Sequence, residues 1–168
     1  MKKKNQTNHA FIDGQNLNLG IKDQGWKLDL KKFRVYLKDK FNVTTAYYFI
    51  GYIEGNSSLY KSLQEYGYLL IFKPTFQDRD GEVKGNCDAE LVLQAMIDYK
   101  KYDKAIIVSG DGDFGCLVSY LIKKNKLETV IAPDNKKCSW LLRKATKNKH
   151  IMFLNGLKNK LEYKKKVP

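Results

Sequence analysis

Short apolar runs and amphipathic stretches alternate along the whole chain. Runs rich in β-branched and aromatic residues predict strands over 9–12, 43–53, 68–72, 105–108, 128–132 and 151–154. Apolar residues at helical spacing predict a helix that ends at 124 and further helices over 28–41, 59–66, 87–101, 139–147 and 155–166. Ser57 and Ser58 are expected to cap the helix over 59–66. Because strands alternate with helices, we predict an α/β fold whose mostly parallel sheet carries helices on both faces.

One predicted strand runs directly into an acidic turn. The segment 105–115 reads AIIVSGDGDFG, so four apolar residues are soon followed by Asp111 and Asp113. In an open α/β sheet, ligands bind beyond the carboxyl ends of the strands. Two neighbouring carboxylates repel each other unless they share a cation or one is protonated. The turn therefore favours a hard cation such as Mg²⁺ or Mn²⁺. A structural alternative stays open, in which Asp113 caps the next helix and Asp111 is a turn residue.

The same turn fits a second template, the dinucleotide-binding fingerprint. Gly110, Gly112 and Gly115 form G-x-G-x-x-G between a strand and a helix, and Asp134 follows about 20 residues later. That fingerprint depends on bare backbone amides that meet a pyrophosphate. Here two aspartates would face the same anion with no cation between them, so we reject this interpretation on charge.

Two more segments place acids at the end of a strand or the start of a helix. Asp13 follows the strand over 9–12, and Asn16 lies three residues further on, where its amide can bind or orient a ligand. Asp88 lies in the first turn of the helix over 87–101, on its apolar side, which is unusual unless it faces a polar pocket. Each has a structural alternative, because D-G-x-N is favourable turn chemistry and a helix dipole stabilises an acid at the N-terminus.

Several acids with few other catalytic groups indicate metal-assisted hydrolysis of a phosphodiester. Asn16 and Ser109 are the polar neighbours of these acids. A serine triad is disfavoured, because His9 and His150 are the only histidines in the sequence. The sequence also contains no Walker lysine motif.

The charge is distributed unevenly along the chain. The formal net charge is +13, and residues 1–122 carry 17 basic and 15 acidic side chains, whereas residues 123–168 carry 14 and 3. This pattern favours a polyanionic partner, most simply nucleic acid, over a merely solvated lysine-rich surface. The predicted phosphate-binding residues are Lys84, Lys136, Lys137, Arg143, Lys144, Lys147 and Lys149. The apolar side of the helix over 139–147 is expected to consist of Trp140, Leu141 and Ala145.

A chain of 168 residues, 43% of them hydrophobic, suits one folded domain. We expect a disordered basic leader over 1–8, the domain over 9–157 and a basic tail over 158–168. No apolar run reaches the length of a membrane span, and the apolar segment near the N-terminus is too short for a signal peptide. The cysteines form neither a zinc pattern nor a disulfide framework, so a cytoplasmic location is expected.

Three segments together resemble the signature blocks of the NYN domain, a branch of the PIN-like nucleases that includes the LabA-like proteins. They read FIDGQNLN, KGNCDAELVLQAM and IIVSGDGDFGCLVSYL, and the resemblance covers roughly residues 9 to 155. It implies a Rossmann-like, PIN-like three-layer sandwich with a central, mostly parallel sheet of five or six strands. The acidic metal site that it implies consists of Asp13, Asp88, Asp111 and Asp113. The supporting polar positions that it implies are Asn16 and Ser109.

By this resemblance, the protein is a Mg²⁺- or Mn²⁺-dependent ribonuclease that cuts single-stranded RNA by water attack. The products would carry a 5′-phosphate and a 3′-hydroxyl, and a homodimer is a candidate assembly. One departure concerns the last basic helix, after whose alanine members of the family often place an acid. Here Ala145 is followed by Thr146, Lys147 and Asn148, and basic residues at this place can serve RNA binding instead.

Two rival hypotheses accompany the ribonuclease. The first is a non-catalytic module on the same fold that binds RNA or a partner protein. The second is another magnesium-dependent phosphotransfer enzyme. A phosphatase needs a second aspartate two residues after its nucleophile, but Asp13 is followed by Gly14 and Gln15. A Toprim-type enzyme needs a glutamate on its first strand, where this chain has Asp13.

Overall fold

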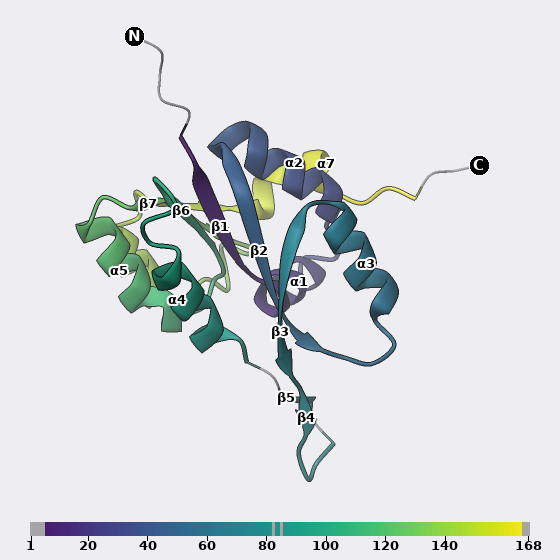
Figure 1. Ribbon diagram of the computed structural model, residues 1–168. Coiled ribbons are helices and arrows are strands. Elements are labelled where there is room, and N and C mark those ends of the chain that lie inside the picture. The colour runs from purple at the N-terminus through teal and green to yellow at the C-terminus, as the bar shows by residue number, and fades with distance from the viewer. Residues whose placement is uncertain (1–5, 82, 85, 166–168) are drawn as a thin grey trace.

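Six parallel strands form one sheet in the order β3-β2-β1-β6-β7-β8 (Figure 1). The chain is described by a computed structural model over residues 6–81, 83–84 and 86–165, without the side chains of 77, 83 and 84. The strands are β1 (Asn8–Asp13), β2 (Val43–Tyr52), β3 (Tyr68–Pro74), β6 (Ala105–Val108), β7 (Leu127–Ala132) and β8 (Ile151–Phe153). The predicted mostly parallel sheet of five or six strands is confirmed. The strand order reverses between β1 and β6, which makes their carboxyl ends the switch point of the sheet.

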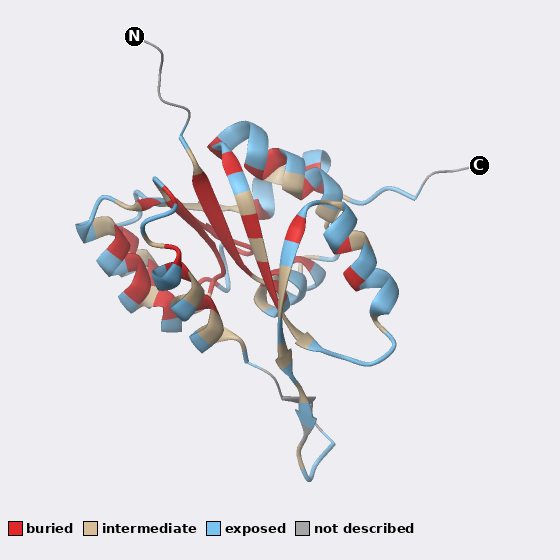
Figure 2. Cartoon of the chain, in the orientation of Figure 1, coloured by how far each residue is buried: buried red, intermediate tan, exposed pale blue. Residues whose placement is uncertain are grey.

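Helices cover both faces of the sheet, which confirms the three-layer sandwich. One face packs against α1 (Gly14–Lys22), α2 (Leu30–Phe41), α3 (Ser57–Glu65) and α7 (Lys158–Leu161). The other packs against α4 (Asp88–Ile97), α5 (Gly115–Lys123) and α6 (Trp140–Thr146). Two short 3-10 helices, η1 (Gly112–Phe114) and η2 (Leu154–Leu157), precede α5 and α7. In Figure 2 the central strands are buried, whereas the outer sides of the helices are exposed.

The central strands are apolar on both faces. Ala10 and Ile12 of β1 belong to the core on the α1 side, whereas Phe11 between them belongs to the core on the α4 side. Ile106 and Ile107 of β6 divide in the same way, and all five side chains are fully buried. A parallel strand covered on both faces needs an unbroken apolar run rather than an alternating one, which explains the AIIV sequence of β6.

The largest difference from the sequence prediction is α1, which follows β1 directly. The residues of D-G-Q-N suggested a turn, but Asp13 instead caps the helix and accepts a hydrogen bond from the Asn16 amide at 3.1 Å. Leu17 and Ile21 are buried on the sheet side of α1. Their burial stabilises a helix whose glycines and asparagines have low intrinsic helix propensity.

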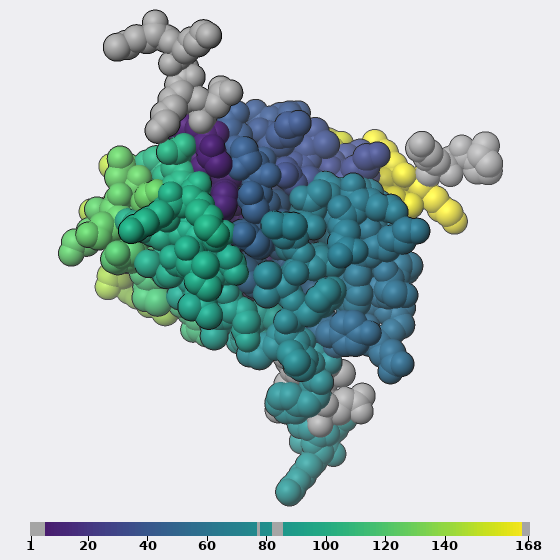
Figure 3. Space-filling model, in the orientation of Figure 1, coloured from purple at the N-terminus to yellow at the C-terminus, as the bar shows by residue number. Residues whose placement is uncertain are grey.

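Three other expectations are corrected in detail. Asn56, not a serine, precedes α3, and Ser57 and Ser58 form its first turn without a side-chain cap. Residues 74–86, whose many polar and charged residues predict a loop, contain an antiparallel hairpin of β4 (Phe76–Gln77) and β5 (Val83–Lys84), which projects from the body of the molecule (Figure 3). Helix α4 ends at Ile97 rather than at 101, and the residue that follows it, Asp98, is fully buried.

The predicted leader and tail lie partly outside the described residues, at 1–5 and 166–168. Within the described residues, β1 begins at Asn8, and the Thr7 amide donates to Asp103 Oδ2 at 2.8 Å. Leu161 of α7 is fully buried, and its carbonyl accepts from the Asp29 amide at 2.8 Å. Among the helices that the structure describes, none combines the length and apolar character needed to cross a membrane.

Candidate functional site

The carboxyl ends of β1 and β6 lie side by side at the switch point. Ile12 pairs with Val108 in the sheet, so the next residues, Asp13 at the end of β1 and Ser109 just after β6, lie side by side at this edge. Ser109 is fully buried, and its Oγ donates a hydrogen bond of 3.2 Å to Asp13 Oδ2. Residues that are far apart in the sequence thus meet where an α/β sheet binds ligands.

Asn16 and Ser109 connect the two chain segments through their side chains. The Gly110 amide donates to Asn16 Oδ1 at 2.8 Å, which holds α1 against the turn after β6. The Asp111 amide donates to Ser109 Oγ at 3.1 Å while the same hydroxyl donates to Asp13. The side chains of these two residues therefore join the start of α1 and the end of β1 to the turn after β6.

Asp111 begins the 3-10 helix η1 that leads into α5. Its Oδ1 accepts a hydrogen bond from the Asp113 amide at 2.9 Å, and its backbone is extended, as at a helix N-cap. Asp113 lies in the first turn of η1, and Phe114 rather than Asp113 precedes α5. The structural alternative for Asp113 as the cap of the next helix is therefore wrong, whereas Asp111 does have a turn role.

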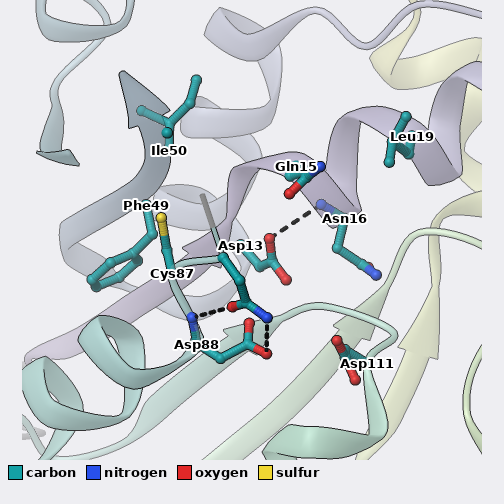
Figure 4. Close-up of a pocket in the computed structure, with 11 residues that line it drawn as sticks. Asp13, Gln15, Asn16, Leu19, Phe49, Ile50, Cys87, Asp88 and Asp111 are labelled. Carbon is teal, nitrogen blue, oxygen red and sulfur yellow. Dashed lines mark hydrogen bonds between the residues drawn. The ribbon is translucent and has the colours of Figure 1, made fainter. Parts of the chain in front are cut away.

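Asp88 begins α4, and Asn86 holds it from the preceding turn. The Asp88 amide donates to Asn86 Oδ1 at 2.7 Å, and Asn86 Nδ2 donates to Asp88 Oδ2 at 3.0 Å (Figure 4). Sequence reasoning missed Asn86. Its signal was an asparagine two residues before an acid at a helix start, a spacing that favours an Asx turn.

Three of the predicted acids form a compact group. One carboxylate oxygen from each of Asp88, Asp111 and Asp113 lies within 4.8 Å of the other two. Asp13 is not part of this group among the described residues, but it lines the same pocket as Asp88 and Asp111 (Figure 4). The pocket has a volume of about 210 Å³. Converging carboxylates are the donor set that a hard divalent cation prefers, so these residues fit such an ion.

Burial and mutual repulsion perturb two of the acids. Burial, with the charges of Asp88 and Asp111, raises the pKa of Asp13 to about 6, although hydrogen bonds from the Asn16 amide and Ser109 oppose the shift. Burial also raises the pKa of Asp88, and the charges of Asp111 and Asp113 add to the effect. Carboxylates that are held together despite burial and mutual repulsion are typical of functional sites, where a cation or a proton relieves the repulsion.

Cys87 lines the acidic pocket, but it does not have the properties of a nucleophile. Burial, together with the charges of Glu90 and Asp13, raises the pKa of its thiol to about 11. The reactive form of cysteine is the thiolate, which is scarce at neutral pH when the pKa is raised. The chemistry of the pocket therefore belongs to its carboxylates.

The basic helix α6 begins directly against the acidic turn. The Ser139 amide donates to the Gly110 carbonyl at 3.0 Å, and Ser139 Oγ caps α6 by accepting from the Leu141 amide at 3.2 Å. A Cβ atom on Gly112 would lie 2.4 Å from Ser139 Oγ, so this glycine allows the turn and the helix to touch. Close packing thus accounts for one glycine of the apparent dinucleotide fingerprint.

The exposed side of α6 differs from the prediction. Trp140 and Leu141 were expected on the apolar side of this helix but are 66% and 54% exposed. Leu142 and Thr146 are fully buried instead, and Ala145 packs against the core only in part. Residues 142 and 146 are one turn apart, and the Thr146 hydroxyl satisfies its hydrogen bonding by donating to the Leu142 carbonyl at 2.9 Å.

The predicted phosphate-binding residues differ in their surroundings. Lys137 forms a 2.6 Å ion pair with Asp23, and the Arg143 guanidinium lies 4.8 Å from the centre of the Phe153 ring. Lys144 Nζ lies 5.0 Å from the centre of a ring of Trp140. The side chains of Lys136, Lys147 and Lys149 are exposed. The side chain of Lys84 lies outside the described residues.

The fold and the site define an α/β protein of Rossmann-like order with an acidic cluster at its switch point. Residues 10–154 match the NYN domain family, so the chain belongs to this family. The Low amplitude and bright protein LabA of Synechococcus elongatus is 25% identical over 134 residues, which cover 74% of this chain and 72% of LabA. A crystal structure of a Vibrio parahaemolyticus protein of unknown function superposes with a TM-score of 0.80 at 21% identity, over 97% of this chain and 100% of that one.

These comparisons bear differently on fold and function. The Vibrio parahaemolyticus structure supports the fold alone, because its sequence identity is low. Membership in the NYN family, part of the PIN-like nuclease superfamily, supports a nuclease-type role. The group of Asp88, Asp111 and Asp113 is consistent with the divalent metals that such nucleases typically use.

Proposed function

We propose that the protein is a metal-dependent endoribonuclease that hydrolyses phosphodiester bonds of single-stranded RNA. The observation that carries this proposal is the convergence of Asp88, Asp111 and Asp113, whose oxygens lie within 4.8 Å of one another at the switch point of the sheet. Unpaired carboxylates at this distance repel each other, and a divalent cation offsets that repulsion.

The acids have distinct proposed roles. Asp88, Asp111 and Asp13 are the main ligands for Mg²⁺ or Mn²⁺, and the exposed Asp113 is a further ligand or a base that orients the attacking water. A bound divalent cation supplies Lewis-acid chemistry, lowering the pKa of water and neutralising charge on the phosphodiester. Ser109, through its hydrogen bond to Asp13 Oδ2, holds the Asp13 carboxylate in position.

The RNA strand is proposed to reach the acids along α6. This helix starts against the acidic turn, and Lys144, Lys147 and Lys149 are exposed on it or just after it. Trp140 adds an exposed ring on which an unpaired base can stack. Lysines neutralise phosphates and an aromatic ring binds a base face, so the combination suits a single strand.

The second candidate is a non-catalytic module that binds RNA or a partner protein. The sequence after Ala145 favours it, because Lys147 and Asn148 stand exposed where related proteins often carry an acid. This module would bind RNA with an affinity that falls with salt and does not depend on magnesium.

Cleavage of a fluorescent single-stranded RNA by the purified protein tests the proposal. We expect cutting with Mg²⁺ or Mn²⁺, none with EDTA, and slower cutting of the same sequence within a duplex. Products with a 5′-phosphate would support water attack. RNA that is bound but never cut with either ion would contradict the nuclease and favour the binding module.

A further inference from the structure

A second, larger cavity adjoins the acidic pocket. It has a volume of about 590 Å³ and lies between α1, the carboxyl end of β2 and the start of α3. Gln15, Ile50 and Gly51 line both this cavity and the acidic pocket, so the two are immediate neighbours. Small-molecule sites in proteins commonly measure about 300–1,000 Å³, so the space suits a ligand of nucleotide size. We call it the side cavity.

Much of the wall of the side cavity is apolar. Trp26 and Tyr48 are buried residues of the core that contribute part of their surface to the cavity. Ile53 and Leu59, by contrast, are 46% and 38% exposed and leave apolar surface open beside them. Aromatic and branched side chains around an open space favour a flat, poorly hydrated group such as a nucleobase.

The other residues that line the side cavity make it positively charged, whereas the adjoining acidic pocket is negatively charged. Among the described residues that line it, none is acidic, and Lys22 and Lys27 are basic. Asn18 and Asn56 supply amide groups that can both donate and accept hydrogen bonds. Amides can bind the edge of a base, and lysines can bind a phosphate.

We propose that the side cavity binds an unpaired nucleobase next to the phosphodiester held in the acidic pocket. The identity of this ligand rests on the proposed nuclease function. Since the two spaces share Gln15, Ile50 and Gly51 as lining residues, they lie close enough for one nucleotide to place its base in the side cavity and a phosphate at the acids. A base paired within a duplex cannot enter the cavity, so the arrangement selects single strands.

The two tryptophans of the chain make this proposal measurable. In a Trp140→Phe variant, Trp26 at the cavity wall is the sole tryptophan and reports on the side cavity. In EDTA, we expect adenosine 5′-monophosphate to quench its fluorescence saturably at millimolar concentrations. Ribose 5-phosphate has the phosphate without the base, so we expect it to quench far less.

A matched pair of charge substitutions localises the binding. Leu59→Glu places a carboxylate at the cavity wall and is expected to weaken nucleotide binding about tenfold, an effect of roughly 1.4 kcal/mol. Leu93→Glu makes the same change on the exposed side of α4, outside the cavity, and should leave binding unchanged. Circular dichroism of both variants verifies that they fold.

Four results would overturn the proposal. The first is quenching by ribose 5-phosphate that equals the quenching by adenosine 5′-monophosphate, and the second is no saturable quenching by the nucleotide. The third is equal nucleotide binding by Leu59→Glu and Leu93→Glu. The fourth is that the protein binds an apolar dye but does not bind the nucleotide. The last would assign the cavity to an apolar ligand. Nucleotide binding that persists in a protein unable to cut RNA would contradict the nuclease while supporting the base site, so the two failures are distinguishable.

Discussion

Ser109 donates a hydrogen bond of 3.2 Å to Asp13 although the two residues are 96 positions apart in the chain. The bond joins the ends of β1 and β6, the two strands between which the order of the sheet reverses. Asp13 also caps α1, and Ser109 also accepts from the amide of Asp111. The placement of the acids therefore depends on the fold as a whole, which makes their properties testable without a substrate.

The raised pKa of Asp13 predicts a pH dependence of stability. Its pKa of about 6 in the folded protein exceeds the ordinary value of 3.8, so folding favours the protonated form. The contribution of Asp13 to the free energy of unfolding is therefore largest below about pH 4, and it is lost as the pH rises through about 6. Asp13→Asn removes the titration and can still cap α1.

Urea unfolding in EDTA from pH 4 to pH 7 measures this effect. The free energy of unfolding of Asp13→Asn should rise relative to the parent protein by on the order of 2 kcal/mol across this range. A difference that stays constant with pH would show that Asp13 titrates normally.

Gly14 lies in close contact with its neighbours, so we expect a side chain at this position to destabilise the protein. A Cβ atom there would lie 2.4 Å from Tyr48 Cε1 and 2.8 Å from the backbone oxygen of Phe49. Because Tyr48 is buried in the core, neither neighbour can move freely, and Gly14→Ala should destabilise the protein by about 1–3 kcal/mol. Gly156→Ala is the control, since nothing lies within 4 Å of its added carbon. Equal unfolding midpoints in urea for the two variants would refute the argument.

Trp140 is predicted to stack on RNA. Loss of one stacked base costs about 1–3 kcal/mol, so Trp140→Ala should weaken binding of a single-stranded RNA in EDTA by about fivefold or more. Tyr120→Ala is the matched control, because Tyr120 is also an exposed ring with a lysine, Lys124, at 5.8 Å. Fluorescence anisotropy measures both affinities. If the tryptophan variant bound as tightly as the tyrosine variant, α6 would not be the stacking surface.

We expect the lysines after α6 to make RNA binding depend on salt concentration. Lys147 and Lys149 should be replaced together by alanine. The logarithm of RNA affinity falls linearly with the logarithm of salt concentration, and each phosphate contact contributes slightly less than one unit to this slope. The double variant should therefore have a slope that is shallower by about one to two units. Lys31 and Lys38, exposed on α2, provide the control double variant. An unchanged slope in the first pair would place the RNA elsewhere.

Sequence reasoning predicts the buried strands best. The bounds of β6 are predicted to the residue, because four apolar residues in a row suit a strand covered on both faces. The turn after it follows from the same segment. Helix α1 was not predicted, because Gly14, Asn16 and Gly20 favour turns locally. Only the burial of its apolar side in the folded protein makes this segment helical.

The candidate site is predictable only in part. The acids stand out because charged residues follow apolar runs, but their mutual distances depend on strand order, which the sequence pattern does not specify. Asn86, which binds Asp88 through two hydrogen bonds, has only a weak local signal, an asparagine two residues before an acid at a helix start. The exposure of Trp140 could not be predicted either, since helical spacing on a seven-residue helix allows more than one buried face.

Asp111 belongs to the acidic group and caps η1, so its replacement shows whether this group is the catalytic metal site. The decisive measurement compares the cleavage rate of one single-stranded RNA, with saturating Mn²⁺, by the parent protein, Asp111→Asn and Asp39→Asn. Asp39 is an exposed acid on α2 that serves as the control. We expect Asp111→Asn to lose activity by on the order of 100-fold or more while Asp39→Asn keeps it, with both unfolding like the parent. Cleavage by Asp111→Asn at the parent rate would contradict the assignment of the acidic cluster as the catalytic metal site.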